Sequence, residues 1–167
     1  MNIKKGLFIF SELLYNKRAL LSRLDNCKTM ESESVRYLVL HCSATRCNQD
    51  YSVEQLRSDH LARGFCDIGY HFYVRKDGTL TQHRFLLEVG AHARPYNRCS
   101  IGICYEGGLD EQGKPANTLT LAQKQHIKDL IAILCRLFPK AKVVGHRDLP
   151  GTIPKACPCF DAEAMFG

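Results

Sequence analysis

The sequence lacks several features that would place it in a specialised class. Its 167 residues hold no apolar run that could span a bilayer, no Cys-x-x-Cys pair, no internal repeat and no low-complexity tract. A membrane-spanning helix needs about 20 apolar residues, and zinc ribbons and thioredoxin-type redox sites need closely paired cysteines. The hydrophobic fraction of 45% and the charged fraction of 24% are those of a globular chain, which excludes a mainly disordered protein, a collagen and a coiled-coil rod.

The sequence also lacks a block of one charge. The formal net charge is +6 at neutral pH, and the excess is spread along the chain. An arm that binds nucleic acid would concentrate Lys and Arg in one segment, so we expect no nucleic-acid partner. The mild excess suits contact with a polyanion, and ordinary surface chemistry explains it equally well.

The nine cysteines are an odd number, so they cannot all be paired. The default interpretation is that they are reduced thiols in a reducing compartment and act as small hydrophobic side chains. One or two of them could still have a special role, which the neighbouring residues must indicate.

Residues 1–34 are interpreted as an N-terminal extension. Leucines between Leu13 and Leu24 allow one amphipathic helix, and Glu31–Ser34 forms a polar linker. Two lysines and the apolar run Gly6–Phe10 look like the opening of a secretion signal, but Ser11 and an acidic residue interrupt that run. We therefore expect no secretion signal and a cytoplasmic location for the newly made chain.

Residues 35–167 are predicted to form one α/β domain, with helices flanking a single mixed central β-sheet. The helices are predicted where Ser or Thr is followed three residues later by Gln, a capping pattern. The predicted strands cover 36–42, 70–75, 100–105 and 142–145, and the predicted helices cover 52–63 and 120–138.

Three side chains in this domain could hold a metal ion. His41 lies at the end of the first predicted strand, His146 at the end of the last, and Cys157 in a Pro-rich loop that follows. Strand ends and a loop can meet at one edge of a sheet, and imidazole and thiolate groups are preferred zinc ligands. Three protein ligands leave the fourth position open, as in catalytic sites. The alternative is two partly buried histidines beside an inert cysteine.

Two further residues could assist chemistry at such a site. Lys155 lies two positions before Cys157, and its ammonium could stabilise an oxyanion on a polarised carbonyl. Tyr70 lies at a strand start, where its phenol could donate a hydrogen bond. The alternatives are a surface lysine and, for Tyr70 and His71, ordinary half-buried packing.

Six short motifs occur in an order that resembles a known family. They are His41-Cys42-Ser43-Ala44-Thr45, Gly69-Tyr70-His71-Phe72, Gly90-Ala91-His92-Ala93, Asn97 with Ser100-Ile101-Gly102-Ile103, Gly145-His146-Arg147-Asp148 and Lys155-Ala156-Cys157-Pro158-Cys159-Phe160-Asp161. This order closely resembles the zinc-dependent N-acetylmuramoyl-L-alanine amidases of the phage-lysozyme type, which share their fold with peptidoglycan-recognition proteins. The resemblance covers about residues 36–162.

The resemblance implies a site and a reaction. Its metal ligands fall on His41, His146 and Cys157, with one Zn²⁺ per chain, and its catalytic residues fall on Tyr70 and Lys155. His92 and Asn97 fall where the family contacts or shapes the substrate groove, and His71 joins them as a candidate substrate-binding residue. The implied reaction is hydrolysis of the amide between N-acetylmuramic acid and L-alanine in peptidoglycan. The implied protein is a monomeric endolysin without a membrane span, cytoplasmic until it is released to the cell wall.

The chain departs from the family pattern at several positions. Residues 1–34 have no counterpart in the minimal family domain. Cys159 replaces a common serine and is an alternative metal ligand by spacing alone. Cys104 stands where some relatives carry an acidic residue, and Glu106 is expected on the opposite face of its strand. Two other functions stay open: a peptidoglycan-binding module without hydrolysis, and a bifunctional phage amidase that also inhibits a polymerase.

Overall fold

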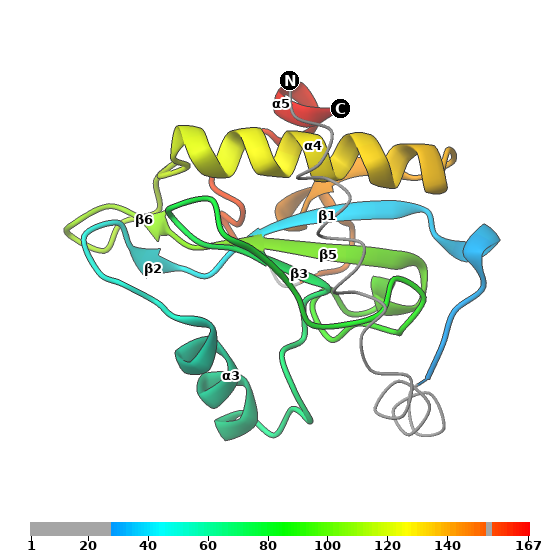
Figure 1. The fold of residues 1–167 in the computed structure, drawn as a ribbon, viewed down its shortest axis with the longest axis horizontal. Coiled ribbons are helices and arrows are strands. Elements are labelled where there is room, and N and C mark those ends of the chain that lie inside the picture. The colour runs from blue at the N-terminus through cyan, green and yellow to red at the C-terminus, as the bar shows by residue number, and fades with distance from the viewer. Residues whose placement is uncertain (1–27, 153–154) are drawn as a thin grey trace.

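The computed structural model describes residues 28–152 and 155–167, and its centre is a five-stranded β-sheet (Figure 1). The strand order is β4-β3-β5-β1-β7, and all neighbours pair in parallel except the edge strand β4. The strands are β1 (Tyr37–Cys42), β3 (Phe72–Val74), β4 (Leu80–Gln82), β5 (Ser100–Tyr105) and β7 (Lys142–Gly145). A separate parallel pair joins β2 (Thr45–Arg46) to β6 (Gly108–Leu109). The prediction of one mixed sheet flanked by helices is confirmed.

The helices begin where the capping patterns predicted them. In α3 (Val53–Ala62) the Ser52 side chain accepts a hydrogen bond from the backbone N–H of Gln55 at 3.2 Å. In α4 (Leu121–Leu137) Thr120 and Gln123 cap each other reciprocally, at 3.1 and 3.0 Å. A short C-terminal helix, α5 (Ala162–Phe166), contacts β7. Each cap satisfies backbone donors that the first helical turn leaves unpaired.

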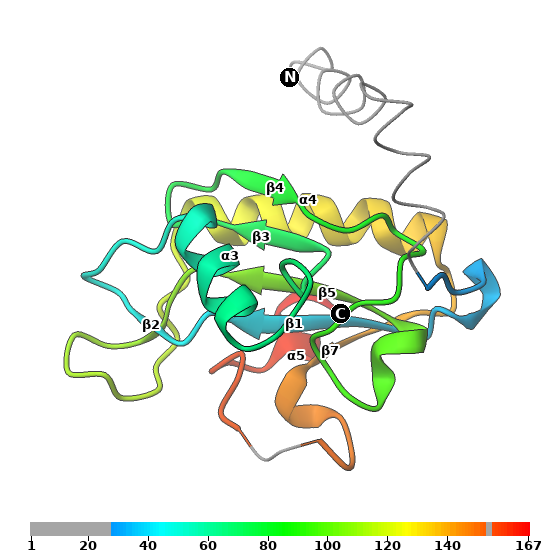
Figure 2. The same ribbon diagram turned by 90° about the horizontal axis from the view of Figure 1, so that it is seen from below.

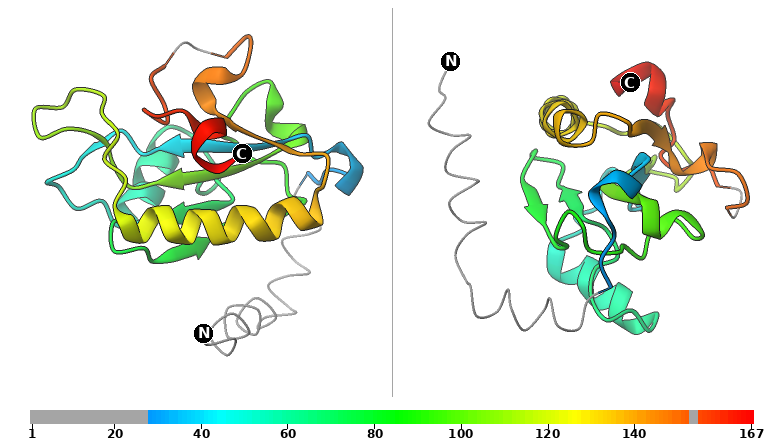
Figure 3. Two further views of the ribbon diagram at one scale, coloured as in Figure 1. Left: turned by 90° about the horizontal axis from the view of Figure 1, so that it is seen from above. Right: turned by 90° about the vertical axis from the view of Figure 1, so that its right-hand side faces the viewer.

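The sheet separates two layers of different character. Helix α4 lies along one face and α3 lies on the other, as the views in Figures 2 and 3 show. Leu38 and Leu40 of β1 pack in the large apolar cluster that includes the buried residues of α4. Val39 and His41, the alternating residues of the same strand, face the opposite side. The period of two along a strand therefore places His41 on the α3 side of the sheet.

The N-terminal end of the described chain packs against the domain before residue 35. Met30 is 7% exposed within the α4-side cluster, and its N–H donates to the carbonyl of Leu87 at 2.8 Å. The carbonyl of Lys28 accepts from the N–H of Val89 at 2.8 Å. The predicted linker contains a 3₁₀ turn at Ser32–Ser34. The helix predicted between residues 13 and 24 lies outside the described residues.

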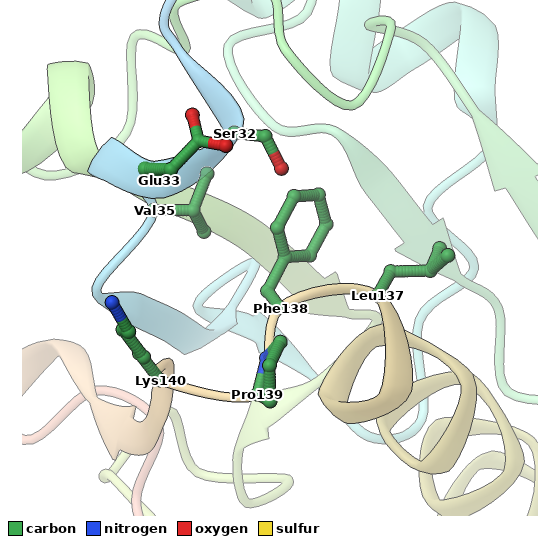
Figure 4. Close-up of a pocket in the computed structure, with 7 residues that line it drawn as sticks. All are labelled: Ser32, Glu33, Val35, Leu137, Phe138, Pro139 and Lys140. Atoms are coloured by element: carbon green, nitrogen blue, oxygen red, sulfur yellow. The ribbon is translucent and has the colours of Figure 1, made fainter.

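A small hollow lies between this turn and the C-terminal end of α4 (Figure 4). It is lined by Ser32, Glu33, Val35, Leu137, Phe138, Pro139 and Lys140. Its volume of about 200 Å³ is below that of typical small-molecule sites, and none of the candidate site residues lines it. No helix among the described residues is both long and apolar enough to cross a membrane.

Candidate metal centre

The two candidate histidines meet because they follow neighbouring parallel strands. Leu40 of β1 is paired with Gly145 of β7, so the next residues, His41 and His146, emerge side by side. Their ring centroids are 4.7 Å apart. The chain turns away directly afterwards into a 3₁₀ helix, His146–Asp148, which ends the strand at this position. The predicted convergence of the two strand ends is therefore what the structure shows.

Cys157 completes the group from the loop that follows. Its carbonyl accepts from the N–H of Arg147 at 2.9 Å, and its Sγ accepts from the N–H of Cys42 at 3.3 Å. Its Sγ lies 3.8 Å from His41 Nδ1, and the ligand atoms of the three residues all lie within 4.8 Å of one another. Tetrahedral zinc with ordinary bond lengths places neighbouring N and S ligands roughly 3.5 Å apart. The donor set and its spacing fit a metal ion of this kind.

Burial keeps both imidazoles in the form that can bind a metal. Desolvation holds the pKa of His41 well below its usual value, and the charges of His92, His146 and Lys155 add to this effect. Burial also lowers the pKa of His146, with a further contribution from Lys155. Neutral imidazoles have a free lone pair at neutral pH. Because the exposed Lys155 acts on both histidines, its ammonium lies within electrostatic reach of the cluster.

Tyr70 lies against the same cluster. Its ring centroid is 5.1 Å from that of His41 and 5.4 Å from that of His60, a helix α3 residue. Burial raises the pKa of Tyr70, so its hydroxyl stays protonated and able to donate. His60 was not identified from the sequence. It is 2% exposed, and its Nδ1 accepts from the N–H of Gly69, which fixes the backbone before Tyr70.

His92 and Asn97 also lie at this side of the sheet, and their contacts are internal. His92 Nδ1 is 3.0 Å from His41 Nε2. The Asn97 Oδ1 accepts hydrogen bonds from the N–H groups of His92 and Ala93, at 2.9 and 2.8 Å. Asn97 therefore holds the short loop that carries His92, and His92 contacts a candidate ligand.

The structure does not bring His71 to the candidate site surface. Its ring is fully buried, its Nδ1 accepts from the N–H of Gly102 at 3.0 Å, and its Nε2 lies 2.8 Å from the carbonyl of Glu88. Both ring nitrogens are used inside the fold, which leaves neither for a substrate. His71, expected from the sequence as a substrate contact, instead joins Gly102 of β5 to the loop at Glu88, against which Lys28–Met30 packs.

Cys159 points away from the histidines although it is only two residues from Cys157. Its backbone has a φ of 71°, so the segment is not extended and the two side chains diverge. The Cys159 thiol donates to the carbonyl of Gly108 at 3.2 Å and lies 3.9 Å from the Cys42 sulfur. Among the described residues, only His41, His146 and Cys157 form a group that could hold a metal ion.

Cys104 of β5 and Glu106, which directly follows that strand, lie on the same side of the sheet as His41. Cys104 is paired with His41 and is fully buried. The Glu106 carboxylate accepts from the N–H of Tyr51 at 2.7 Å and pairs with Arg75 at 3.2 Å. Tyr51 packs in the Cys104 cluster, so the expectation that Glu106 would face the opposite side was wrong. Residues two apart in a strand share a face.

Comparisons with known proteins show which chains this one is similar to. The family model described as N-acetylmuramoyl-L-alanine amidase matches residues 31–160. The chain is 39% identical to the endolysin of Escherichia phage T7 over 136 residues, covering 81% of this chain and 88% of that protein. It is 40% identical to the endolysin of Enterobacteria phage T3 over 129 residues, covering 77% and 83%. Among solved structures, the endolysin and N-acetylmuramoyl-L-alanine amidase LysCS from Clostridium intestinale has a TM-score of 0.64 at 27% identity, covering 78% of this chain and 79% of that one.

Proposed function

The chain belongs to the N-acetylmuramoyl-L-alanine amidase family, and from that premise we propose that His41, His146 and Cys157 hold one zinc ion at its catalytic centre. The protein is an enzyme of the endolysin type, which hydrolyses the amide between N-acetylmuramic acid and L-alanine in peptidoglycan. The identity of the metal, its ligands and the roles of the neighbouring side chains are the proposed part.

One observation carries the proposal: two neutral imidazoles and one thiol, delivered by three separate segments, converge within 4.8 Å. The imidazoles and the thiol are ligands that zinc prefers, and three protein ligands leave a coordination position open. When bound, zinc supplies Lewis-acid chemistry: it polarises a carbonyl group and lowers the pKa of a water molecule to about 7.

The side chains around the centre then have separate tasks. The Lys155 ammonium stabilises the negative charge that develops on the carbonyl oxygen as the amide is attacked. The Tyr70 hydroxyl orients the attacking water or donates to the leaving nitrogen. His60 holds the backbone at Gly69, directly before Tyr70, and Asn97 holds the backbone at His92. The Tyr70 and His92 side chains are therefore in place before substrate arrives.

The substrate determines where the enzyme acts. Peptidoglycan lies outside the bacterial cytoplasm, and the relatives named above are phage endolysins. The protein is made in the cytoplasm and released to the cell wall, where it acts as a monomer. Its mild positive charge suits a polyanionic wall.

The test measures zinc and product together. The purified full-length protein is expected to contain about one zinc per chain and to release soluble peptide with a new L-alanine amino terminus from purified peptidoglycan. Removing zinc with a chelator should abolish release, and adding zinc back should restore it. Binding to peptidoglycan without any release, with or without zinc, would indicate a binding module instead of an amidase. Hydrolysis that is unchanged in a zinc-free sample would refute the metal centre.

A further inference from the structure

The proposed centre rests on His41 presenting one particular ring nitrogen, and the structure indicates what selects it. We propose that His92 is a positioning residue for this ligand. It accepts a hydrogen bond from His41 Nε2–H and so fixes the tautomer and the ring orientation that present Nδ1 to the metal. This inference rests on the proposed function and assigns His92 a role inside the fold, in place of the substrate contact expected from the sequence.

The direction of the hydrogen bond follows from the two sides of the His41 ring. His41 Nδ1 faces the cluster, 3.8 Å from Cys157 Sγ, and its Nε2 faces away, 3.0 Å from His92 Nδ1. A neutral imidazole has one N–H, and a ligand nitrogen must have a free lone pair. The proton of His41 is therefore on Nε2, and His92 Nδ1 is the acceptor.

The next contacts continue in the same direction. With Nδ1 as acceptor, the proton of His92 is on Nε2, which lies 3.5 Å from Ser100 Oγ. The Ser100 hydroxyl in turn donates to the carbonyl of Tyr96 at 2.7 Å. Each group in this series of hydrogen bonds donates to the next, so a single arrangement of protons satisfies every donor and acceptor in it. Partners of this kind behind a metal-bound histidine fix its tautomer and raise the affinity for the metal.

The fold is built to hold the His92 ring in this place. A Cβ atom on Gly102 would lie 2.6 Å from the ring, and one on Gly90 would lie 2.4 Å from it. Neither glycine has a positive φ, so both are needed for room and not for backbone conformation. The Asn97 side chain accepts a hydrogen bond from the backbone N–H of His92. The ring therefore packs against Gly90 and Gly102, and neither position has room for a side chain.

The same contacts argue against a groove role for His92. Its two ring nitrogens face His41 and Ser100, and its ring packs nearly perpendicular to that of His41, at 88°. A substrate hydrogen bond would have to replace one of these contacts. The ring is half-buried, and its polar atoms serve the interior.

The experiment compares two variants of similar size, one with a hydrogen-bond acceptor and one without. His92→Asn keeps an acceptor oxygen at the position of Nδ1, whereas His92→Leu fills similar space without an acceptor. Zinc affinity, measured by competition with a chelating dye, should fall about 10–100-fold in His92→Leu and stay within about 3-fold of the unmodified protein in His92→Asn. A purely structural role for the ring would give both variants the same loss.

A second measurement needs no variant and no metal. The ¹⁵N shifts of the His41 ring in the zinc-free protein should show the proton on Nε2. A proton on Nδ1, or a His92→Leu protein with unchanged zinc affinity, would overturn the inference. A protein that binds no zinc but has the expected tautomer would instead refute the metal centre, so the two failures are distinguishable.

Discussion

The two faces of the central sheet differ in what they bury. On the α4 face, β1, β3 and β5 contribute only apolar side chains and tyrosine to one large cluster. On the other face, the same strands and the loops beside them bring together His41, His71 and His92, with Tyr70 and Cys104. The two faces are made from alternate residues of one chain, so a single register sets both.

The difference shows how this fold separates stability from chemistry. Burying Ile127, Leu130, Ile131 and Leu134 of α4 stabilises the fold by roughly 1.5–3 kcal/mol for each side chain. Burying an imidazole costs free energy unless its nitrogens are paired, and the described structure has no buried side-chain N or O atom without a partner. The apolar face thus provides most of the free energy of folding, and the polar face keeps its geometry because the fold as a whole is stable.

The largest expected effect is on the polar face. Replacing His146 by Ala, or Cys157 by Ser, should reduce bound zinc to near background and abolish hydrolysis, because each change removes a proposed ligand. Metal analysis and wall hydrolysis measure both effects. Cys159→Ser is the matched control and should retain zinc and activity, since the Cys159 thiol lies against the Gly108 carbonyl.

Leu134→Ala tests the other half of this comparison. It creates a cavity in the apolar face and should lower the free energy of unfolding by about 2–5 kcal/mol, while the folded protein keeps its zinc. Loss of zinc from folded Leu134→Ala would show that the two faces are not separable.

The two thiol variants have a contrary outcome of their own. Loss of zinc in Cys159→Ser with retention in Cys157→Ser would show that Cys159, and not Cys157, is the ligand.

The next effect is on rate alone. Lys155→Ala and Tyr70→Phe should each keep zinc and the fold but slow hydrolysis by about 10²–10³-fold, or about 3–4 kcal/mol of barrier, because each removes a donor that assists the reaction and is not a ligand. The measurement is kcat with zinc content determined in the same samples. Stoichiometric loss of zinc in either variant would contradict the division between ligands and helpers.

The buried histidines also predict a pH effect on stability. Desolvation lowers the pKa of His60 and of His71 to about 4, below the ordinary value of about 6.5. The unfolded chain then binds more protons than the folded one, so their contribution is complete above pH 6.5, declines as the pH falls, and is lost below about pH 4. The full loss is about 3 kcal/mol for each histidine.

Urea unfolding of the zinc-free protein between pH 7 and 4 measures this loss. His71→Asn keeps an acceptor for the Gly102 N–H and removes one titrating group, so its stability should depend less steeply on pH. An equal pH dependence in His71→Asn and in the unmodified protein would show that burial does not lower the pKa of His71.

The elements, and the convergence of His41 and His146 at two strand ends, could be predicted because their causes are local. The cap at Thr120, the alternation in β1 and the strand ends before His146 are written in short stretches of sequence. The parallel pairing that joins β1 to β7 also follows from common strand–helix–strand topology. These features needed no knowledge of side-chain contacts.

The residues that were missed or misassigned depend on contacts between distant segments. His60 supports Gly69 from helix α3, and His71 bonds β5 and the Glu88 loop. Nothing in the neighbouring sequence distinguishes such a histidine from a ligand. Cys159 has a φ of 71°, a conformation that a non-glycine residue seldom adopts, so its side chain does not follow the alternation of an extended segment.

The smallest expected effect concerns the N-terminal segment, and it joins the two faces in one test. A chain beginning at Lys28 should hydrolyse peptidoglycan and unfold like the full-length protein, because it keeps the Lys28 and Met30 contacts and the whole family match, which begins at residue 31. A chain beginning at Val35 lacks Met30, which is buried on the α4 face, and should lose about 2 kcal/mol of stability. Its rate should stay unchanged while it is folded, because the proposed metal centre is on the opposite face. Urea unfolding and wall hydrolysis of both truncated proteins measure these effects.

Each truncated protein has its own contrary outcome. Slow hydrolysis by the folded chain that begins at Lys28 would show that residues 1–27 contribute to the site. Equal stability of the two truncated chains would show that Met30 contributes little to the apolar face.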